Sequence, residues 1–177
     1  MRVITGSARG VRLQTLDGLD VRPTTERVKE AVFSMIQFDL EGRRFLDLFT
    51  GSGQMGIEAL SRGAEKAWFV DASKASLETA RKNLVKAKLI GKGELISASA
   101  ESFLARTLER FDIAFLDPPY HKNILDTVLP ALEPHINAGG AVICETAADE
   151  VLPESVGGLA VYRTYRYSQT VITVYRK

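Results

Sequence analysis

The sequence predicts an α/β protein in which a mostly parallel sheet is covered by helices on both faces. Between residues 43 and 144, short apolar segments alternate with segments of helical periodicity. Those short segments are apolar on both faces, which is typical of parallel strands buried between two helical layers. The final segments, Leu159–Tyr167 and Thr170–Tyr175, have no room for a helix between them, so they predict an antiparallel pair at the edge of the same sheet.

The composition is that of an ordinary globular domain, with 45% apolar and 25% charged residues in a chain of 177. We expect one domain, residues 1–177, with residues 1–40 as an N-terminal hairpin-and-helix extension and 41–177 as the sheet domain. The single cysteine, Cys144, excludes a disulfide framework and a cysteine-rich zinc site, and we expect no metal. Without a signal peptide or an apolar run of roughly 20 residues, we expect a cytoplasmic monomer with no membrane contact.

The N-terminal extension is predicted from two patterns. Segments Arg2–Thr5 and Val11–Leu13 flank two glycines and indicate a short hairpin. A helix is expected after Pro23, because a threonine follows that can cap it and apolar residues up to Ile36 recur at helical spacing.

The alternating part supplies the sheet and its covering helices. The expected strands are Phe45–Phe49, Ala67–Val70, a weak Gly93–Ser97, Ile113–Leu116 and Ala141–Cys144. The expected helices are Ile57–Arg62, Lys74–Lys88, Glu101–Leu108 and Ile124–Leu132. Pro130 is expected to kink or break the last of these helices, since it cannot donate a backbone hydrogen bond.

A glycine motif lies between the first strand and the first helix of this part. Gly51–Gly56 reads G-x-G-x-x-G, in which glycines allow a sharp turn and close approach of a ligand to the backbone. Asp71 ends the next strand, where a carboxylate can accept hydrogen bonds from ribose hydroxyls. An ordinary strand-to-helix turn is the simpler interpretation, but together with Asp71 the motif favours a cofactor that contains a nucleoside.

Asp47 distinguishes between two such cofactors. NAD would place a pyrophosphate near the glycine turn, and a carboxylate four residues before Gly51 would repel it. S-adenosylmethionine carries a sulfonium and an amino group instead, and a carboxylate attracts both. Asp47 therefore favours S-adenosylmethionine, and the segment around it is similar to the first motif of class I methyltransferases.

The tetrapeptide Asp117-Pro118-Pro119-Tyr120 follows the fourth strand. Its two prolines remove backbone donors, which leaves oxygen acceptors suited to a substrate that presents an NH₂ group. Such acceptors help an exocyclic base amine to become nucleophilic, and Tyr120 offers a ring on which a flipped base can stack. Prolines that merely end a strand are the alternative, but this tetrapeptide, behind a cofactor motif, is typical of methyltransferases that act on adenine N6 or guanine N2.

From end to end the chain resembles the RsmD family of bacterial 16S ribosomal RNA guanine-N2 methyltransferases. The segments that carry the resemblance are Arg2–Ile4, Gly6, Arg9–Gly10, Arg22–Glu30, Asp47–Gly53, Glu58–Ala64 and Asp117–Tyr120. The resemblance implies the three-layer, Rossmann-like fold of class I methyltransferases, with strand order 3-2-1-4-5-7-6. It also implies S-adenosyl-L-methionine as donor and a guanine of 16S rRNA, free or in the small ribosomal subunit, as acceptor.

The motifs and the resemblance together define three sets of candidate residues. The catalytic set is Asp117, Pro118, Pro119 and Tyr120. The cofactor set is Asp47, Phe49, Gly51, Ser52, Gly53, Asp71, Ala72, Ser99 and Ala100, with either Ser99 or Glu101 expected to contact the adenine. The RNA set is Arg2, Arg9, Arg12, Arg22, Thr24 and Arg27, although a solvated helix face explains the last three equally well.

Three other functions are compatible with parts of the pattern. A DNA adenine-N6 methyltransferase shares the tetrapeptide, but such enzymes usually carry a target-recognition region for which 177 residues leave little room. An NAD-dependent oxidoreductase rests on the glycine motif alone. A non-catalytic RNA-binding module would have no need of the intact tetrapeptide.

The net charge of +1 combines basic ends with an acidic middle. Residues 1–16 and 156–177 contain basic side chains and no Asp or Glu. If the two ends lie together, they form a basic patch suited to phosphates. In the second segment, Tyr162, Tyr165 and Tyr167 alternate with arginines, which is compatible either with RNA contact or with an ordinary edge strand.

Overall fold

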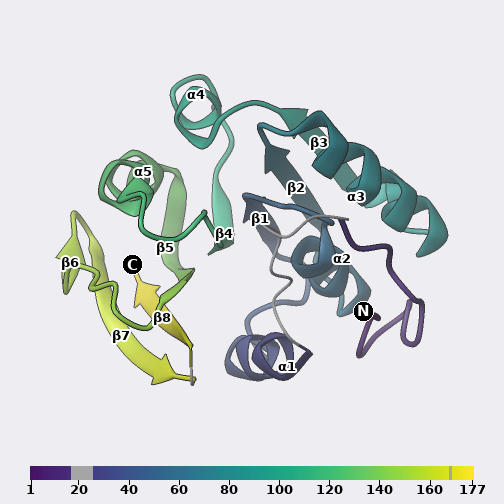
Figure 1. Cartoon of the computed structure of the whole chain (residues 1–177), viewed down its shortest axis with the longest axis horizontal. Coiled ribbons are helices and arrows are strands. Elements are labelled where there is room, and N and C mark those ends of the chain that lie inside the picture. The colour runs from purple at the N-terminus through teal and green to yellow at the C-terminus, as the bar shows by residue number, and fades with distance from the viewer. Residues whose placement is uncertain (17–25, 168) are drawn as a thin grey trace.

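The protein, described from a computed structural model for residues 1–16, 26–167 and 169–177, is built on an eight-stranded sheet (Figure 1). The strand order is β3-β2-β1-β4-β5-β8-β7-β6. The strands are β1 (Arg44–Leu48), β2 (Lys66–Asp71), β3 (Gly93–Ser97), β4 (Phe111–Leu116), β5 (Ile136–Ala147), β6 (Ser155–Val156), β7 (Leu159–Arg166) and β8 (Thr170–Arg176). Strands β1 to β5 pair in parallel, and β6 to β8 are antiparallel. This confirms the predicted fold class and strand order, since β7 and β8 are the sixth and seventh expected strands.

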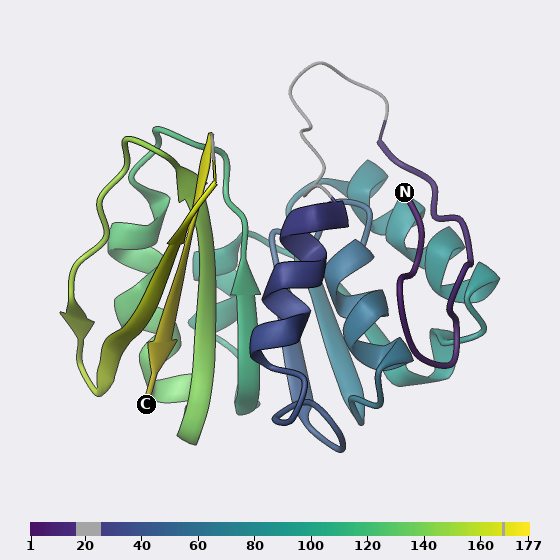
Figure 2. The same ribbon diagram turned by 90° about the horizontal axis from the view of Figure 1, so that it is seen from below.

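Helices cover both faces of the sheet (Figure 2). The helices are α1 (Glu26–Met35), α2 (Gln54–Ser61), α3 (Lys74–Lys86), α4 (Ala100–Leu104) and α5 (Ile124–Leu132), with 3₁₀ turns at Ile90–Lys92 and Glu133–His135. One apolar core lies between the sheet and the layer formed by α1, α2 and α3, and the other lies beneath α4 and α5. Successive residues of a strand enter opposite cores, as Phe45 and Leu46 of β1 do, because strand side chains alternate between faces.

Several boundaries differ from those expected. The first strand ends at Leu48, because Phe49 adopts a left-handed backbone conformation with φ of 69°. The first helix after it begins at Gln54, three residues early, and α4 ends at Leu104, four residues early. Pro130 lies inside α5 without breaking it, and the helix continues to Leu132 because its opposite face, with Leu125, Val128 and Leu129, is buried.

The fifth strand is three times longer than predicted, and a two-residue strand, β6, was not predicted at all. The C-terminal extension of β5 pairs with β8, in a ladder that runs from Ala141–Arg176 to Ala147–Thr170, and at its N-terminal end Ile136 pairs with Phe111 of β4. Such pairing depends on a partner that is distant in sequence, so local periodicity does not reveal it. No helix in the three described ranges has the length and apolarity needed to cross a membrane.

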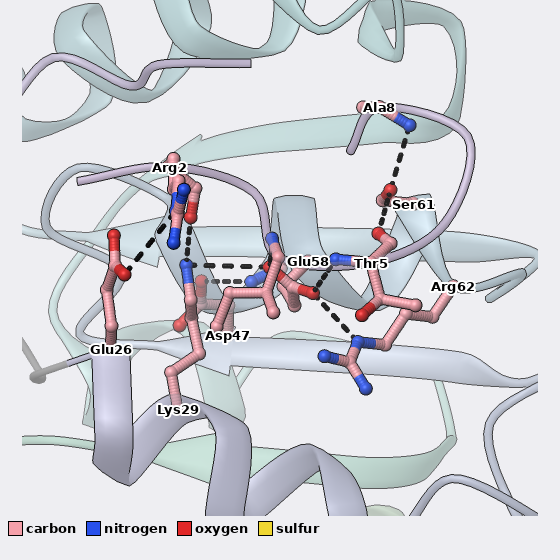
Figure 3. Close-up of polar contacts among 11 residues, drawn as sticks. Arg2, Thr5, Ala8, Glu26, Lys29, Asp47, Glu58, Ser61 and Arg62 are labelled. Atoms are coloured by element: carbon pink, nitrogen blue, oxygen red, sulfur yellow. Dashed lines mark hydrogen bonds and ion pairs between the residues drawn. The ribbon is translucent and has the colours of Figure 1, made fainter. Parts of the chain in front are cut away.

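The predicted N-terminal hairpin is confirmed by an antiparallel bridge between Arg2 and Arg12. A buried carboxylate, that of Glu58 on α2, connects this hairpin to the helical layer (Figure 3). Glu58 accepts hydrogen bonds from the backbone N–H groups of Ile4, at 2.8 Å, and Thr5, at 3.0 Å. Its carboxylate also receives one from Arg62 Nε, at 2.8 Å.

Lys29 of α1 completes this buried network. Its Nζ lies 3.5 Å from Glu58 Oε2 and donates to the carbonyl of Arg2 at 2.6 Å. Burial lowers the pKa of Lys29, and the adjacent carboxylate of Glu58 opposes that shift. Because neither side chain has any exposed surface, Glu58 offsets most of the cost of burying Lys29, and Lys29 joins Arg62 and the two N–H groups in satisfying Glu58.

Replacing the central carboxylate should therefore destabilise the fold strongly. Glu58→Ala leaves Lys29 buried beside no counter-charge and removes the acceptor of two backbone N–H groups, so the free energy of unfolding should fall by about 3 kcal/mol or more. Urea denaturation measures this. The control Glu78→Ala, which removes an exposed ion pair with Lys82 on α3, should change it by less than about 0.5 kcal/mol. A loss below about 1 kcal/mol for Glu58→Ala would contradict this account.

Candidate active site

A cleft of about 940 Å³ opens at the carboxyl ends of the parallel strands. Its lining comes from the segments that follow β1, β2, β3 and β4, together with Thr15 and Leu16 from the N-terminal segment. Open parallel sheets bind ligands at this edge because neighbouring loops diverge there and leave space between them. The cleft therefore brings together the three motifs that the sequence analysis identified.

The turn after β1 forms the first wall. The backbone N–H groups of Phe49 and Thr50 both donate to the carbonyl of Val70 at the end of β2, at 3.0 and 3.1 Å. These bonds hold Phe49 at its positive φ, a conformation that costs energy for a residue with a side chain. The turn ends at Gly53, which precedes α2 and has a φ of 79°, a conformation that suits glycine.

The third glycine of the motif allows α2 to pack closely on the sheet. A Cβ atom at Gly56 would lie 2.3 Å from the ring of Phe69 on β2, which is closer than atoms can approach. The short distance between helix and strand brings the backbone N–H of Gly56 to 2.8 Å from Asp47 Oδ2. The glycine thus determines the hydrogen bonding of the Asp47 carboxylate.

Asp47 is almost fully buried, with 2% of its surface exposed, and it lines the cleft. Burial raises the pKa of its carboxyl group to about 7, against the opposing effect of the hydrogen bond from Gly56. A group balanced in this way responds strongly to nearby charge, so a cation in the cleft would favour its ionised form.

Asp71 forms the second wall and is held by backbone groups. Its Oδ2 accepts from the N–H of Gly51 at 2.9 Å, and its Oδ1 accepts from the N–H of Ser73 at 2.8 Å. Each carboxylate oxygen has a second lone pair, so both can still accept from a ligand hydroxyl. The carboxylate thereby links the glycine turn to the start of α3.

The segment after β3 contributes Ala98, Ser99, Ala100 and Glu101 to the cleft. Ser99 is the N-cap of α4, and its hydroxyl oxygen accepts from the N–H of Ser102 at 3.2 Å. Glu101, in the first turn of the same helix, presents an exposed carboxylate.

The tetrapeptide Asp117–Tyr120 follows β4, and all four of its residues line the cleft. Tyr120 is half-buried, and burial raises the pKa of its phenol, so the hydroxyl stays protonated. That hydroxyl donates to Glu145 Oε1 at 3.3 Å and lies 3.5 Å from Thr170 Oγ1. The next residue, His121, donates its backbone N–H to Glu150 Oε1 at 2.9 Å. The end of β5 and the start of β8 therefore hold this loop in place.

The structure places most of the expected cofactor residues in the cleft. Those that line it are Asp47, Phe49, Gly51, Ser52, Asp71, Ala72, Ser99 and Ala100. Gly53 does not line it and instead packs against Ala80 of α3, so the structure assigns it to the turn.

Sequence reasoning missed the residues that other elements bring to the site. Thr15 and Leu16 come from the N-terminal segment, where no pattern indicated a ligand. Glu145, which is 5% exposed and binds Tyr120, was missed although a carboxylate directly after an apolar strand is a usable signal.

Of the residues expected to bind RNA, the four that the structure describes do not line the cleft. Arg2, Arg9 and Arg12 belong to the N-terminal hairpin, which packs on α2. Arg27 is exposed in the first turn of α1, and its charge lies near Tyr167 rather than at the cleft. Burial raises the pKa of the Tyr167 phenol, and the charge of Arg27 opposes that shift. Arg22 and Thr24 lie outside the described residues.

The two basic ends do not form one patch, so that expectation is wrong. The N-terminal hairpin lies beside α2 and α3, whereas β7 and β8 lie at the opposite side of the molecule, with α1 between them (Figures 1 and 2). Acidic partners also neutralise part of the C-terminal charge, because Arg176 pairs with Asp39 at 2.6 Å and Lys177 with Glu133 at 2.8 Å. The composition of two segments contains no information about their distance in space.

The arrangement suits a reaction that depends on holding two ligands in a fixed relative position. Carboxylates near the glycine turn can accept hydrogen bonds from hydroxyl and ammonium groups, and the tetrapeptide supplies acceptors beside an aromatic ring. Across the described ranges, no three His, Cys, Asp or Glu side chains are grouped so that they could hold a metal ion.

The raised pKa of Asp47 has a consequence for stability. The folded state holds the proton more tightly than the unfolded state, whose carboxyl titrates near 3.8, so the free energy of unfolding falls as pH rises from about 4 to above 7. Asp47→Asn cannot titrate and should remove that fall. Urea denaturation should show the stability of the variant relative to the unmodified chain rising by more than about 1 kcal/mol between pH 4 and pH 8. The exposed, non-titrating control Leu108→Ala should give a constant difference, and a constant difference for Asp47→Asn would refute the assignment.

Comparisons with known proteins extend over the whole fold. The profile of the family described as "Conserved hypothetical protein 95" matches residues 1–176. The Bacillus subtilis (strain 168) protein named "Putative rRNA methyltransferase YlbH" is 38% identical over 182 residues, which cover 100% of this chain and 99% of the relative. "Ribosomal RNA small subunit methyltransferase D" of Haemophilus influenzae is 33% identical over 180 residues, which cover 94% and 93%.

Solved structures with the same fold include methyltransferases. The structure described as "Putative methyltransferase yhhF from Escherichia coli" superposes with a TM-score of 0.89 at 32% identity, over 100% of this chain and 97% of the other. An RNA methyltransferase from Salinibacter ruber, solved in complex with S-adenosyl-L-homocysteine, shares the fold with a TM-score of 0.70 at 16% identity, over 88% and 93%. Because the family profile and relatives above 30% identity span almost the entire chain, this protein belongs to the family described as conserved hypothetical protein 95, the RsmD family that its motifs resemble.

Proposed function

We propose that this protein transfers a methyl group from S-adenosyl-L-methionine to the exocyclic N2 amine of a guanine in small-subunit ribosomal RNA. The observation that carries the proposal is that one cleft contains both Asp47 and Asp71, beside the glycine turn, and the whole tetrapeptide Asp117–Tyr120. The names of the relatives, which include ribosomal RNA small subunit methyltransferase D, support RNA as the substrate class.

The residues of the cleft fit the cofactor group by group. Asp71 retains acceptor capacity on both oxygens for the two ribose hydroxyls. Asp47, whose pKa of about 7 leaves it easily ionised by a cation, suits the sulfonium and amino groups. Ser99 already caps α4, so we assign the adenine amine to the carboxylate of Glu101. The bound cofactor would supply an electrophilic methyl group.

The tetrapeptide prepares the acceptor amine for attack. Its oxygen atoms, in particular the Asp117 carboxylate, can accept hydrogen bonds from an NH₂ group and stabilise the positive charge that develops on nitrogen during methylation. Tyr120 offers its ring for stacking, while Glu145 and Thr170 hold its hydroxyl. No strong base is required, because the methylated ammonium loses its proton readily.

The geometry argues against the oxidoreductase alternative. A dinucleotide would bring its pyrophosphate to the glycine turn, close to Asp47, whose carboxylate accepts from the N–H of Gly56 in the first turn of α2 and would repel a diphosphate once ionised. Asp71 does not discriminate, because a ribose of either cofactor can bind it. The adenine-N6 alternative uses the same tetrapeptide, so the modified nucleotide must identify the acceptor.

Nucleotide analysis tests the proposal directly. The protein and methyl-labelled S-adenosylmethionine should methylate small-subunit rRNA isolated from cells that lack the native enzyme, and mass spectrometry of the digested RNA should detect N2-methylguanine. RNA from cells that retain the enzyme is the control and should accept little label. Labelled N6-methyladenine, or no labelled nucleoside, would exclude the proposal.

Asp117 provides a test at the level of one residue. Asp117→Ala removes an acceptor used by the amine but touches no group assigned to the cofactor, so the rate of methyl transfer should fall by about a hundredfold or more. Calorimetry should show cofactor affinity within twofold of the unmodified chain. The matched control Asp71→Ala should have the opposite profile, with cofactor affinity lost first. Turnover by Asp117→Ala within tenfold of normal would refute the role given to Asp117.

A further inference from the structure

A second hollow, of about 430 Å³, lies between α1 and the β7–β8 pair. Its strand wall is unusual in composition, since it consists of three tyrosines, two arginines and one valine. The aromatic and basic members are Tyr162, Arg163, Tyr165, Tyr167 and Arg176. We call this hollow the tyrosine groove.

A β-bulge brings these side chains to one face. In the β7–β8 ladder Val161 is opposite Tyr175 and Arg163 is opposite Val174, so β7 carries one extra residue at Tyr162. Val161 packs into the core beneath α5, and strict alternation would send Arg163, Tyr165 and Tyr167 to that same face. Tyr165 and Tyr167 instead pack against the core on the α1 side. The bulge thus turns three residues toward the groove, and bulges commonly re-aim side chains next to functional sites.

Tyr162 is the most exposed ring of the groove, with 63% of its surface accessible. The guanidinium carbons of Arg163 and Arg176 lie 5.6 and 5.8 Å from its centroid, within the range of a cation–π interaction. Arg163 Nη1 also lies 3.5 Å from the hydroxyl of Tyr165, to which it donates. The groove therefore presents aromatic faces together with positive charge.

We propose that the tyrosine groove binds a single-stranded segment of the RNA that adjoins the nucleotide in the cleft, an inference that rests on the proposed function. Bases stack on aromatic rings and guanidinium planes, whereas phosphates pair with cations, and this groove offers both. Residues 156–177 contain no Asp or Glu, and Arg163 supplies positive charge to the groove, whereas Arg176 shares its charge with Asp39, whose carboxylate lies 2.6 Å away.

The groove leads to the cleft. Tyr167 begins the β7–β8 turn, and its N–H donates to the carbonyl of Thr170 at 2.8 Å. The hydroxyl of Thr170 lies 3.5 Å from that of Tyr120, which lines the cleft. The five residue steps from Tyr162 to Tyr167, at about 3.3 Å each, cover roughly 16 Å. An RNA strand that follows this path would reach the tetrapeptide directly.

The test measures RNA affinity without relying on catalysis. The full chain and the double variant Tyr162→Ala/Arg163→Ala are titrated by fluorescence anisotropy into a labelled 12-nucleotide single-stranded RNA and into a 12-base-pair duplex. The unmodified chain should prefer the single strand, and the double variant should bind it about tenfold or more weakly. Tyr162→Phe keeps the ring and should retain affinity within twofold.

Exposed positions away from the groove provide matched controls. Leu108→Ala, which removes an exposed apolar side chain, and Arg81→Ala, which removes an exposed arginine on α3, should leave RNA affinity unchanged. In the double variant, calorimetry should show unchanged affinity for S-adenosylmethionine, and methylation of deproteinised rRNA should show a raised KM with kcat within twofold.

The outcomes separate this inference from the proposed function. If the unmodified chain methylates no RNA while the double variant still loses affinity for the single strand, the proposed methyltransferase function is refuted and RNA binding by the tyrosine groove is supported. Unchanged RNA affinity in the double variant, or equal affinity of the unmodified chain for single strand and duplex, overturns the groove. Loss of methylation confined to assembled small subunits, with RNA affinity intact, would also overturn it in favour of a protein partner.

Discussion

The buried carboxylate of Glu58 is the constraint on which the helical layer depends. A charge without solvent contact must be satisfied completely, and Glu58 is satisfied by two hairpin N–H groups, Arg62 and Lys29 (Figure 3). The N-terminal hairpin, α1 and α2 can therefore pack in only one relative arrangement. Gly56, two residues before Glu58 on α2, donates its N–H to Asp47. The same helix therefore joins the buried network to the wall of the cleft.

The two carboxylates at the glycine turn show how environment separates similar groups. Asp47 is enclosed by the sheet and α2, so burial raises the pKa of its carboxyl to about 7. Asp71 is partly exposed and bonds to two backbone N–H groups, and each of its oxygens keeps a lone pair for a ligand hydroxyl. One position can thus respond to the charge of a ligand, whereas the other recognises its hydroxyl groups.

Local patterns predicted the sheet because each strand and helix carries its own periodicity. The parallel strands and the N-terminal hairpin follow from alternation and glycine placement, whereas the strand order came from the family resemblance, and the structure confirms all three. The full length of β5, the short β6 and the bulge at Tyr162 depend on pairing with distant segments, so no local window contains them. The same limit explains why Glu145 and Thr170 behind Tyr120, and Thr15 and Leu16 in the cleft, were missed.

The sequence by itself determined the fold class, the family and the three motifs, because each is carried by local periodicity or by a short run of residues. It also indicated that the motifs share one edge of the sheet, since parallel strands direct their following loops there. Only the tertiary structure decided which groups meet there. It separated the two basic ends, although their composition had suggested a shared patch, and it placed Gly53 in the turn rather than in the cleft. It also turned the tyrosines of β7 toward α1. The physical reason is that distance and facing are set by packing and strand register between remote segments, which residue order does not encode locally.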